Sequence, residues 1–120
     1  MKNNLFNKLN HQSPDWVVNE FFNTLYMRGE FLKSISDLLG RTGYVLNEER
    51  CIFPDFTDPD PSCHFKGVMF GIVDEEYVVS DIQFFEYVEL AVNQYFIRHP
   101  DEADKVEEIL SVIRNRRWIQ

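Results

Sequence analysis

Three prolines, Pro54, Pro59 and Pro61, stand close together in the middle of the 120-residue chain. Proline has no backbone N–H to donate, so residues 54–62 cannot form an interior strand or a helix. We therefore expect an exposed loop at this point, and the elements on either side must fold around it.

Strand-like segments flank this loop. Residues 44–46 and 51–53 precede it, and residues 65–73 and 77–79 follow it; all are rich in apolar, β-branched or aromatic side chains. A charged turn over residues 74–76 joins the last two. The sequence predicts a small antiparallel sheet of three to four strands.

Two helices are predicted before the strands. Ser13 can cap a helix that Pro14 opens, and aromatic and aliphatic residues then recur at helical spacing to Met27. Gly29 permits a break. Residues 31–39 form a second amphipathic segment, which Gly40 is expected to end as a C-cap.

Two further helices are predicted after the strands. Ser80 and Gln83 have the spacing of a capping box, which opens a helix that Pro100 ends. Pro100 and the acids after it start a fourth helix. The fold class is therefore α+β: one domain over residues 1–120, with two N-terminal and two C-terminal helices flanking the sheet on one or both faces.

Charge is unevenly distributed along the chain. Residues 1–50 and 98–120 each hold as many acids as bases, whereas residues 51–97 hold nine acids and one base, so the net charge of −8 arises there. Proteins bind the phosphates of nucleic acids through Lys and Arg. The acidity of this segment therefore argues against direct nucleic-acid binding and favours a basic partner. Many soluble proteins are acidic for solubility alone, so the position of the charge says more than its total.

The cysteine content and the hydropathy favour a cytoplasmic protein. Cys51 and Cys63 are too few for a disulfide scaffold, which favours a reducing compartment. The longest apolar run, residues 67–73, is too short to span a bilayer, and the first residues lack the apolar core of a signal peptide. We expect no membrane contact.

Neither a catalytic motif nor a metal-binding motif is present. The chain has no P-loop, G-x-G-x-x-G, H-E-x-x-H or G-x-S-x-G. Cys51, Cys63 and His64 match no standard zinc spacing, and the aspartates of the proline-rich loop lack the spacing of an EF-hand. The sequence predicts a protein that is not an enzyme and that needs no cofactor or metal.

The aspartates of the proline-rich loop are predicted to direct charge outward. The prolines hold Asp55, Asp58 and Asp60 extended and apart, so none is neutralised by a helical neighbour four residues away. Phe56 lies among them. It is either folded inward beneath a solvated loop or exposed as the aromatic anchor of an acidic interface.

Several segments together resemble the immunity proteins of bacterial contact-dependent growth inhibition systems, the CdiI group paired with ribonuclease toxins. The resemblance is carried by FPDFTDPD, by FKGVMFGIVDEEYVVS and by the helix FFEYVELAVNQYFIRHPDEADKVEEIL. It extends back to FFNTLYMRGEFLKSISDLL and so covers most of the chain. It implies a non-enzymatic cytoplasmic inhibitor that binds the C-terminal toxin domain delivered by a neighbouring cell.

The charge distribution agrees with this role. A ribonuclease needs a basic cleft for its substrate, so a protein that presents carboxylates can occupy the cleft, speed the encounter and exclude RNA. An exosite on the toxin, or a helical face with Glu86 and Glu89, are alternative interfaces. From charge placement, the predicted contact residues are Asp55, Phe56, Asp58, Asp60, Asp74, Glu75, Glu76 and Tyr77.

Two other functions stay open on the sequence alone. One is an acidic adaptor that docks on a basic cellular protein without any toxin. The other is a small hydrolase that uses carboxylates of residues 55–60. A toxin gene immediately upstream would favour the immunity protein, and an isolated gene would favour the adaptor.

Overall fold

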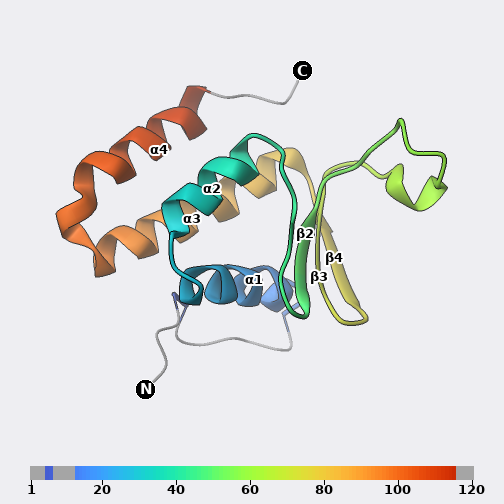
Figure 1. The fold of residues 1–120 in the computed structure, drawn as a ribbon, viewed down its shortest axis with the longest axis horizontal. Coiled ribbons are helices and arrows are strands. Elements are labelled where there is room, and N and C mark those ends of the chain that lie inside the picture. The colour runs from blue at the N-terminus through green and yellow to red at the C-terminus, as the bar shows by residue number, and fades with distance from the viewer. Residues whose placement is uncertain (1–4, 7–12, 116–120) are drawn as a thin grey trace.

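In the computed structural model, which describes residues 5–6 and 13–115, the helices lie on one face of a four-stranded antiparallel sheet (Figure 1). The strands are β1 (Tyr44–Val45), β2 (Glu49–Ile52), β3 (Val68–Ile72) and β4 (Glu75–Val79), and the helices are α1 (Trp16–Met27), α2 (Phe31–Leu39), α3 (Asp81–Arg98) and α4 (Ala103–Asn115). The strands keep their chain order in the sheet. The predicted α+β class, with two helices before the strands and two after them, is confirmed.

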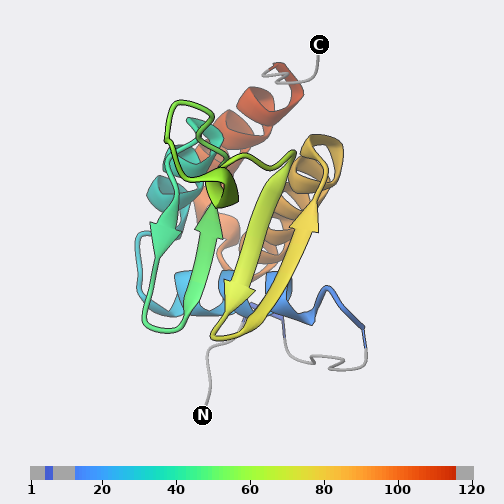
Figure 2. The same ribbon diagram turned by 90° about the vertical axis from the view of Figure 1, so that its right-hand side faces the viewer.

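The sheet has an inner face toward the helices and an open face, which Figure 2 views directly. Cys51 and Phe70 are directly opposite each other on β2 and β3, and both are fully buried, so this pair marks the inner face. Successive side chains of a strand point to opposite sides, so their neighbours Arg50 and Gly71 belong to the open face. No described element covers that face.

Aromatic packing holds α1 against the sheet. Phe21 and Phe22 contact Phe70, with ring centroids 5.5 and 5.9 Å away. All three rings are buried, and burial of a side chain of this size contributes about 1.5–3 kcal/mol. The aromatic stripe of the first helix is therefore core.

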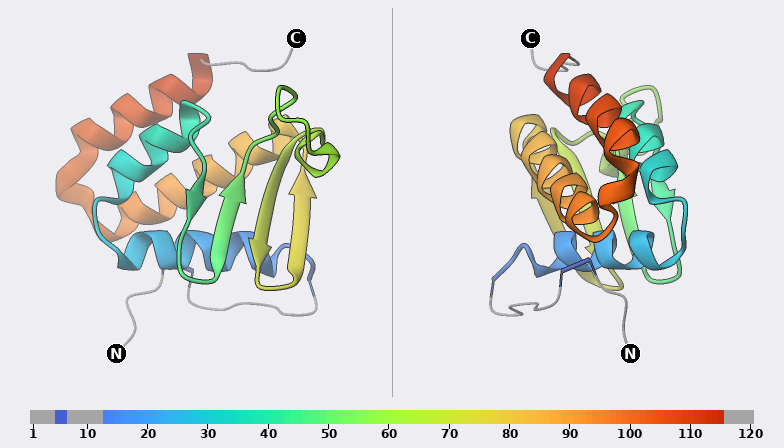
Figure 3. Two further views of the ribbon diagram at one scale, coloured as in Figure 1. Left: turned by 45° about the vertical axis from the view of Figure 1, so that its right-hand side comes forward. Right: turned by 90° about the vertical axis from the view of Figure 1, so that its left-hand side faces the viewer.

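The other three helices complete the helical layer. α4 lies outermost and packs against α2 and α3 (Figure 3). Val106 and Ile113 are its buried residues. The start of α3 is fixed to the sheet, because Phe84 stacks on Phe70 at 6.3 Å.

The first helix begins later than predicted. Its N-cap is Asp15, and Ser13 donates its hydroxyl to the Asp15 carboxylate instead of capping backbone amides. The same carboxylate accepts a hydrogen bond from Tyr87 on α3, at 3.0 Å. The start of α1 is thus set by a tertiary contact.

The strand boundaries also differ from the prediction. β2 begins at Glu49 and β4 at Glu75, because Glu49, Ile72 and Glu75 stand in register on neighbouring strands. The turn between β3 and β4 is reduced to Val73 and Asp74. Glu75 and Glu76 are therefore strand residues.

β3 begins only at Val68, because the chain makes a sharp bend before it. Gly67 has a φ of +94°, and a Cβ at this position would lie 2.0 Å from the carbonyl oxygen of Val79. Only glycine fits there.

The predicted C-terminus of α2 and the predicted N-terminus of α3 agree with the structure. Ser80 and Gln83 form both hydrogen bonds of the capping box, at 3.1 and 2.9 Å. Gly40 is the C-cap of α2, although the left-handed residue is Arg41, with a φ of +67°.

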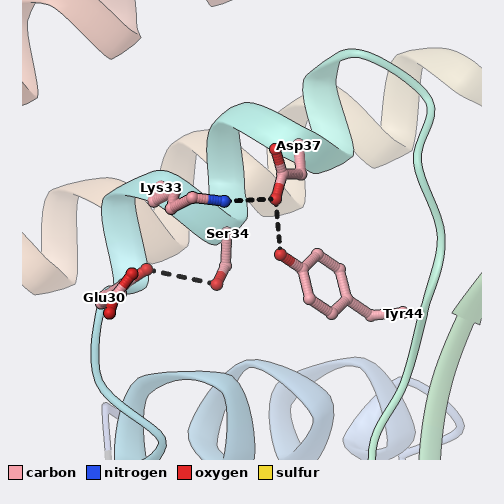
Figure 4. A network of polar contacts seen from close by, with 5 residues as sticks. All are labelled: Glu30, Lys33, Ser34, Asp37 and Tyr44. Atoms are coloured by element: carbon pink, nitrogen blue, oxygen red, sulfur yellow. Dashed lines mark hydrogen bonds and ion pairs between the residues drawn. The ribbon is translucent and has the colours of Figure 1, made fainter.

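A polar network ties the short strand β1 to α2 (Figure 4). The Tyr44 hydroxyl donates to the carboxylate of Asp37 at 2.7 Å, and Lys33 approaches the same oxygen at 3.3 Å. The Tyr44 hydrogen bond is the largest cause of the lowered pKa of Asp37. The edge of the sheet is thereby fixed to the helical layer.

Candidate partner-binding surface

The proline-rich segment forms a loop with its own hydrogen bonds, here called the aspartate loop (residues 54–64). Its base is closed by the Asp55 N–H, which donates to the carbonyl of Cys63 at 2.8 Å. A single turn of 3₁₀ helix, η1 (Pro61–Cys63), lies within it. The loop stands out beyond the sheet on the side of the open face (Figure 1).

Each aspartate of this loop receives a backbone hydrogen bond from two residues further along. Asp55 accepts from Thr57 at 3.0 Å, Asp58 accepts from Asp60 at 2.9 Å, and Asp60 accepts from Ser62 at 3.0 Å. Such local bonds are typical of Asx turns. These local bonds hold the carboxylates in place.

The same bonds favour the charged form of two of these carboxyls. The side chain and backbone of Thr57 lower the pKa of Asp55, and the backbone and side chain of Ser62 lower the pKa of Asp60. A carboxylate that accepts hydrogen bonds is stabilised relative to the protonated acid. Both groups are therefore ionised at neutral pH.

Phe56 is exposed, so it is not folded inward beneath the loop. Its side chain is 64% exposed, and its ring stacks on His64 with the centroids 5.6 Å apart. The His64 ring in turn contacts the carbonyl of Asp58. An aromatic ring is thus held outside the core among the carboxylates.

The second acidic group lies at the tip of the β3–β4 hairpin. Asp74, Glu75 and Glu76 are all exposed. Glu76 forms an ion pair with Arg50 at 3.0 Å, whereas Asp74 and Glu75 have no ion pair among the described residues. Negative charge therefore remains at this end of the sheet.

The register of the sheet adds an acid to this tip that sequence reasoning did not assign to it. The Val73 N–H donates to the carbonyl of Glu48 at 3.2 Å, which places the exposed Glu48 in the β1–β2 turn beside the β3–β4 turn. We call Glu48, Asp74, Glu75 and Glu76 the acidic tip. The sequence did not point to Glu48 because residues 1–50 hold equal numbers of acids and bases, so this part of the chain has no net charge.

The structure does not bring the two acidic groups together. The aspartate loop precedes β3 and the acidic tip follows it, so they lie at opposite ends of this five-residue strand (Figure 2). At about 3.3 Å per residue, that is a separation of roughly 17 Å along the strand. They share the open face of the sheet, which lies between them.

Tyr77 lies on the other side of the sheet. It is directly opposite Phe70 on β3, and its half-buried ring packs against the core. Its side chain therefore belongs to the inner face, unlike that of Phe56.

No group of three His, Cys, Asp or Glu side chains in residues 5–6 and 13–115 is arranged to hold a metal ion. Cys51 is buried in the core, where burial raises the pKa of its thiol. Cys63 and His64 lie in the aspartate loop instead. Within the same residues, no helix has the length and apolarity needed to cross a membrane.

The family model described as CDI immunity protein, for contact-dependent growth inhibition, matches residues 14–110. The chain belongs to this family. The match runs from just before α1 into α4, so it includes the sheet and both acidic groups, and it confirms the resemblance to immunity proteins of contact-dependent growth inhibition. The role of the immunity protein is thus to neutralise a toxin.

A solved structure gives the same fold. The immunity protein described here is similar to an immunity protein, NMB0503, from Neisseria meningitidis MC58, with a TM-score of 0.71 over 93% of this chain and 99% of the other. The two are 22% identical, so the likeness concerns the fold. No curated protein matches the sequence significantly.

Proposed function

We propose that this immunity protein neutralises a ribonuclease toxin domain by covering its basic RNA-binding surface with the aspartate loop and the acidic tip. The observation that carries the proposal is the exposed Phe56 ring, held among carboxylates that hydrogen bonds within the loop keep in place. An aromatic anchor with a charged rim is typical of protein–protein interfaces. Neutralisation would take place in the cytoplasm, where the RNA is.

Electrostatics gives this arrangement two advantages. Opposite charges steer two proteins together and raise the association rate by roughly 10–1,000-fold at low salt. Carboxylates that already make local hydrogen bonds also need little reordering when they bind, which lowers the entropic cost. Tyr77 is left out of the proposed contact surface because its ring faces the helices.

The first test is inhibition of the neighbouring toxin. The toxin domain encoded immediately upstream is expressed with and without this chain, and growth and RNA integrity are followed. Co-expression should restore both. If growth were restored while the purified toxin domain cleaved no RNA, immunity would stand and the ribonuclease assignment would be wrong.

The second test removes charge from the aspartate loop without changing its shape. The triple variant Asp55→Asn, Asp58→Asn, Asp60→Asn keeps an oxygen that can accept each local hydrogen bond. Its association rate with the toxin domain at low salt should fall by about tenfold or more, and the salt dependence should weaken.

A matched variant removes three charges elsewhere. Glu86→Gln, Glu89→Gln, Glu108→Gln neutralises exposed side chains of α3 and α4. It should leave the association rate within about twofold, since these residues lie outside the proposed interface. If this variant slowed association and the loop variant did not, the interface would lie on the helices.

A further inference from the structure

The open face of the sheet is mostly apolar where it borders the aspartate loop. Ile52, Met69 and Val78 stand side by side on β2, β3 and β4 and point to this face. Ile52 and Met69 are half-buried, and Val78 is 49% exposed. A sheet with one face in water usually carries polar side chains there, so this row departs from the usual pattern.

The next row of the open face combines an ion pair with a further apolar side chain. Arg50, Gly71 and Glu76 are in register, and the Arg50 guanidinium lies over Gly71 to reach Glu76. A Cβ at Gly71 would lie 2.6 Å from the Arg50 Cζ, so glycine is what allows the planar group to lie against the sheet. Val45, the β1 member of this row, is 74% exposed.

A hollow joins this face to the aspartate loop. Its volume is about 360 Å³, and it lies where β1 and β2 meet the base of the loop. The residues that line it are Arg41, Gly43, Tyr44, Val45, Cys51, Ile52, Phe53, Pro54 and Asp55. It is large enough for a side chain of a partner. The apolar rows and the acidic loop therefore form one continuous surface.

The area of the open face can be compared with the area that a stable protein–protein interface buries. The strands have two, four, five and five residues, which at about 3.3 Å along a strand and about 4.8 Å between strands present on the order of 250 Å². A stable interface buries about 800 Å² on each partner. The open face is too small alone, so a stable interface centred on it must extend onto its borders, where the aspartate loop and the acidic tip lie.

We infer that the open face of the sheet is the apolar centre of the surface that docks on the toxin domain, with the aspartate loop and the acidic tip as its charged rims. The inference rests on the proposed function and adds the chemistry of the partner surface. Charge complementarity selects the occupant: a surface with acids at both ends fits an apolar patch bordered by basic residues. A second copy of this chain would bring like charges together if its rims met those of the first.

The test replaces exposed valines with threonine, which keeps the branched shape that strands favour. Val45→Thr, Val78→Thr should weaken the Kd for the upstream-encoded toxin domain by roughly 10–100-fold, because two hydroxyls would be buried without partners. The loss should appear in the dissociation rate, and the salt dependence should stay as in the unmodified chain.

Ile97→Thr is the matched control. Ile97 is 69% exposed near the end of α3, which leads away from the sheet (Figure 1), so its replacement should change the Kd by less than about twofold. Thermal unfolding shows whether each variant is folded.

A footprint on the unmodified chain covers the case in which the double variant fails to fold. Met69 lies on the open face, and Met27 is 59% exposed at the end of α1. Hydrogen peroxide oxidises accessible methionine to the sulfoxide. Bound toxin should slow oxidation of Met69 severalfold and leave that of Met27 unchanged.

The outcomes separate this inference from the proposed function. If the chain did not bind the toxin domain, both would fall. Binding with an unchanged Kd for the valine variant and no protection of Met69 would overturn the inference alone. The isolated chain could also form a dimer that the valine substitutions dissociate, while the affinity for the toxin stays unchanged. That result would show that the open face binds a second copy of the chain, and it would overturn the inference. An effect of the valines without any effect of the loop charges would support the open face as the apolar centre of the contact, but it would refute both the charged rim and the acidic mechanism.

Discussion

The guanidinium of Arg50 on β2 crosses over Gly71 on β3 and forms an ion pair with Glu76 on β4, with 3.0 Å between nitrogen and oxygen. Its other nitrogen donates to the carbonyl of Val73 at 3.1 Å. One side chain thus links three strands across the open face. The contact depends on the absence of a side chain at the middle position.

Gly71→Ala is therefore expected to uncouple Arg50 from Glu76. A double-mutant cycle with Arg50→Met and Glu76→Gln should give a coupling free energy of about 0.5–1 kcal/mol in the unmodified chain, as for other solvent-exposed pairs. In the Gly71→Ala background it should be close to zero, because the added Cβ displaces the guanidinium. Denaturant unfolding gives all the required free energies. Equal coupling in both backgrounds would show that the guanidinium does not need the space above Gly71.

Val73→Asn is expected to stabilise the protein. Val73 has a φ of +52° in the hairpin turn and is 58% exposed, so it bears left-handed strain and adds little to the core. That conformation costs a branched residue roughly 1–2 kcal/mol, and asparagine tolerates it. The melting temperature should rise by about 4 °C for a gain of about 1 kcal/mol. Val45→Asn is the control, because Val45 is in a regular strand, where valine is favoured and asparagine is not. The melting temperature of this variant should fall.

Tyr44→Phe should destabilise the protein in a pH-dependent way. Tyr44 lowers the pKa of Asp37, and a carboxyl with a lowered folded-state pKa stabilises above its unfolded pKa and loses this contribution as pH falls through the folded value. Asp37 is 36% exposed, so solvent screening limits the loss to about 1 kcal/mol at pH 7. Unfolding by urea at about pH 7 and pH 3 should show a smaller loss in acid.

The control for this pair is Lys33→Gln. Lys33 is exposed and lies four residues before Asp37, so its removal should destabilise the protein less than Tyr44→Phe does at neutral pH. An equal loss for Tyr44→Phe at both pH values would mean that the hydroxyl acts through something other than the ionised carboxylate.

The two cysteines should differ in their reaction with iodoacetamide. Cys51 is buried and should not react in the folded protein. Cys63 is partly exposed, but burial and the charges of Asp58 and Asp60 raise its pKa, so it should react more slowly than a free thiol. Asp58→Asn, Asp60→Asn should accelerate the reaction severalfold at about pH 8, as followed by mass spectrometry. The control variant Glu86→Gln, Glu89→Gln should leave the reaction rate of Cys63 unchanged. If it accelerated the reaction as much as the Asp58→Asn, Asp60→Asn variant, the charges of Asp58 and Asp60 would not be the specific cause.

Local signals in the sequence predicted much of the helical structure. The capping box of Ser80 and Gln83 involves residues three positions apart, so its hydrogen bonds form wherever the helix forms. The start of α1 was misplaced by a comparable local argument. There the Asp15 carboxylate bonds to Tyr87, which lies 72 positions later in the chain, and no local pattern records that contact.

The sequence alone determined the order of the elements, the small antiparallel sheet between two pairs of helices, and the outward charge of the aspartate loop. These follow from hydrogen bonds and side-chain periods over a few residues. Only the tertiary structure decided that all helices lie on one face, that the aspartate loop and the acidic tip stand at opposite ends of the other, and that Arg50 meets Glu76. The register of β2 and β3 joins residues as far apart as Glu49 and Ile72, beyond the range of any local pattern, and it is set by how the inner face packs against α1.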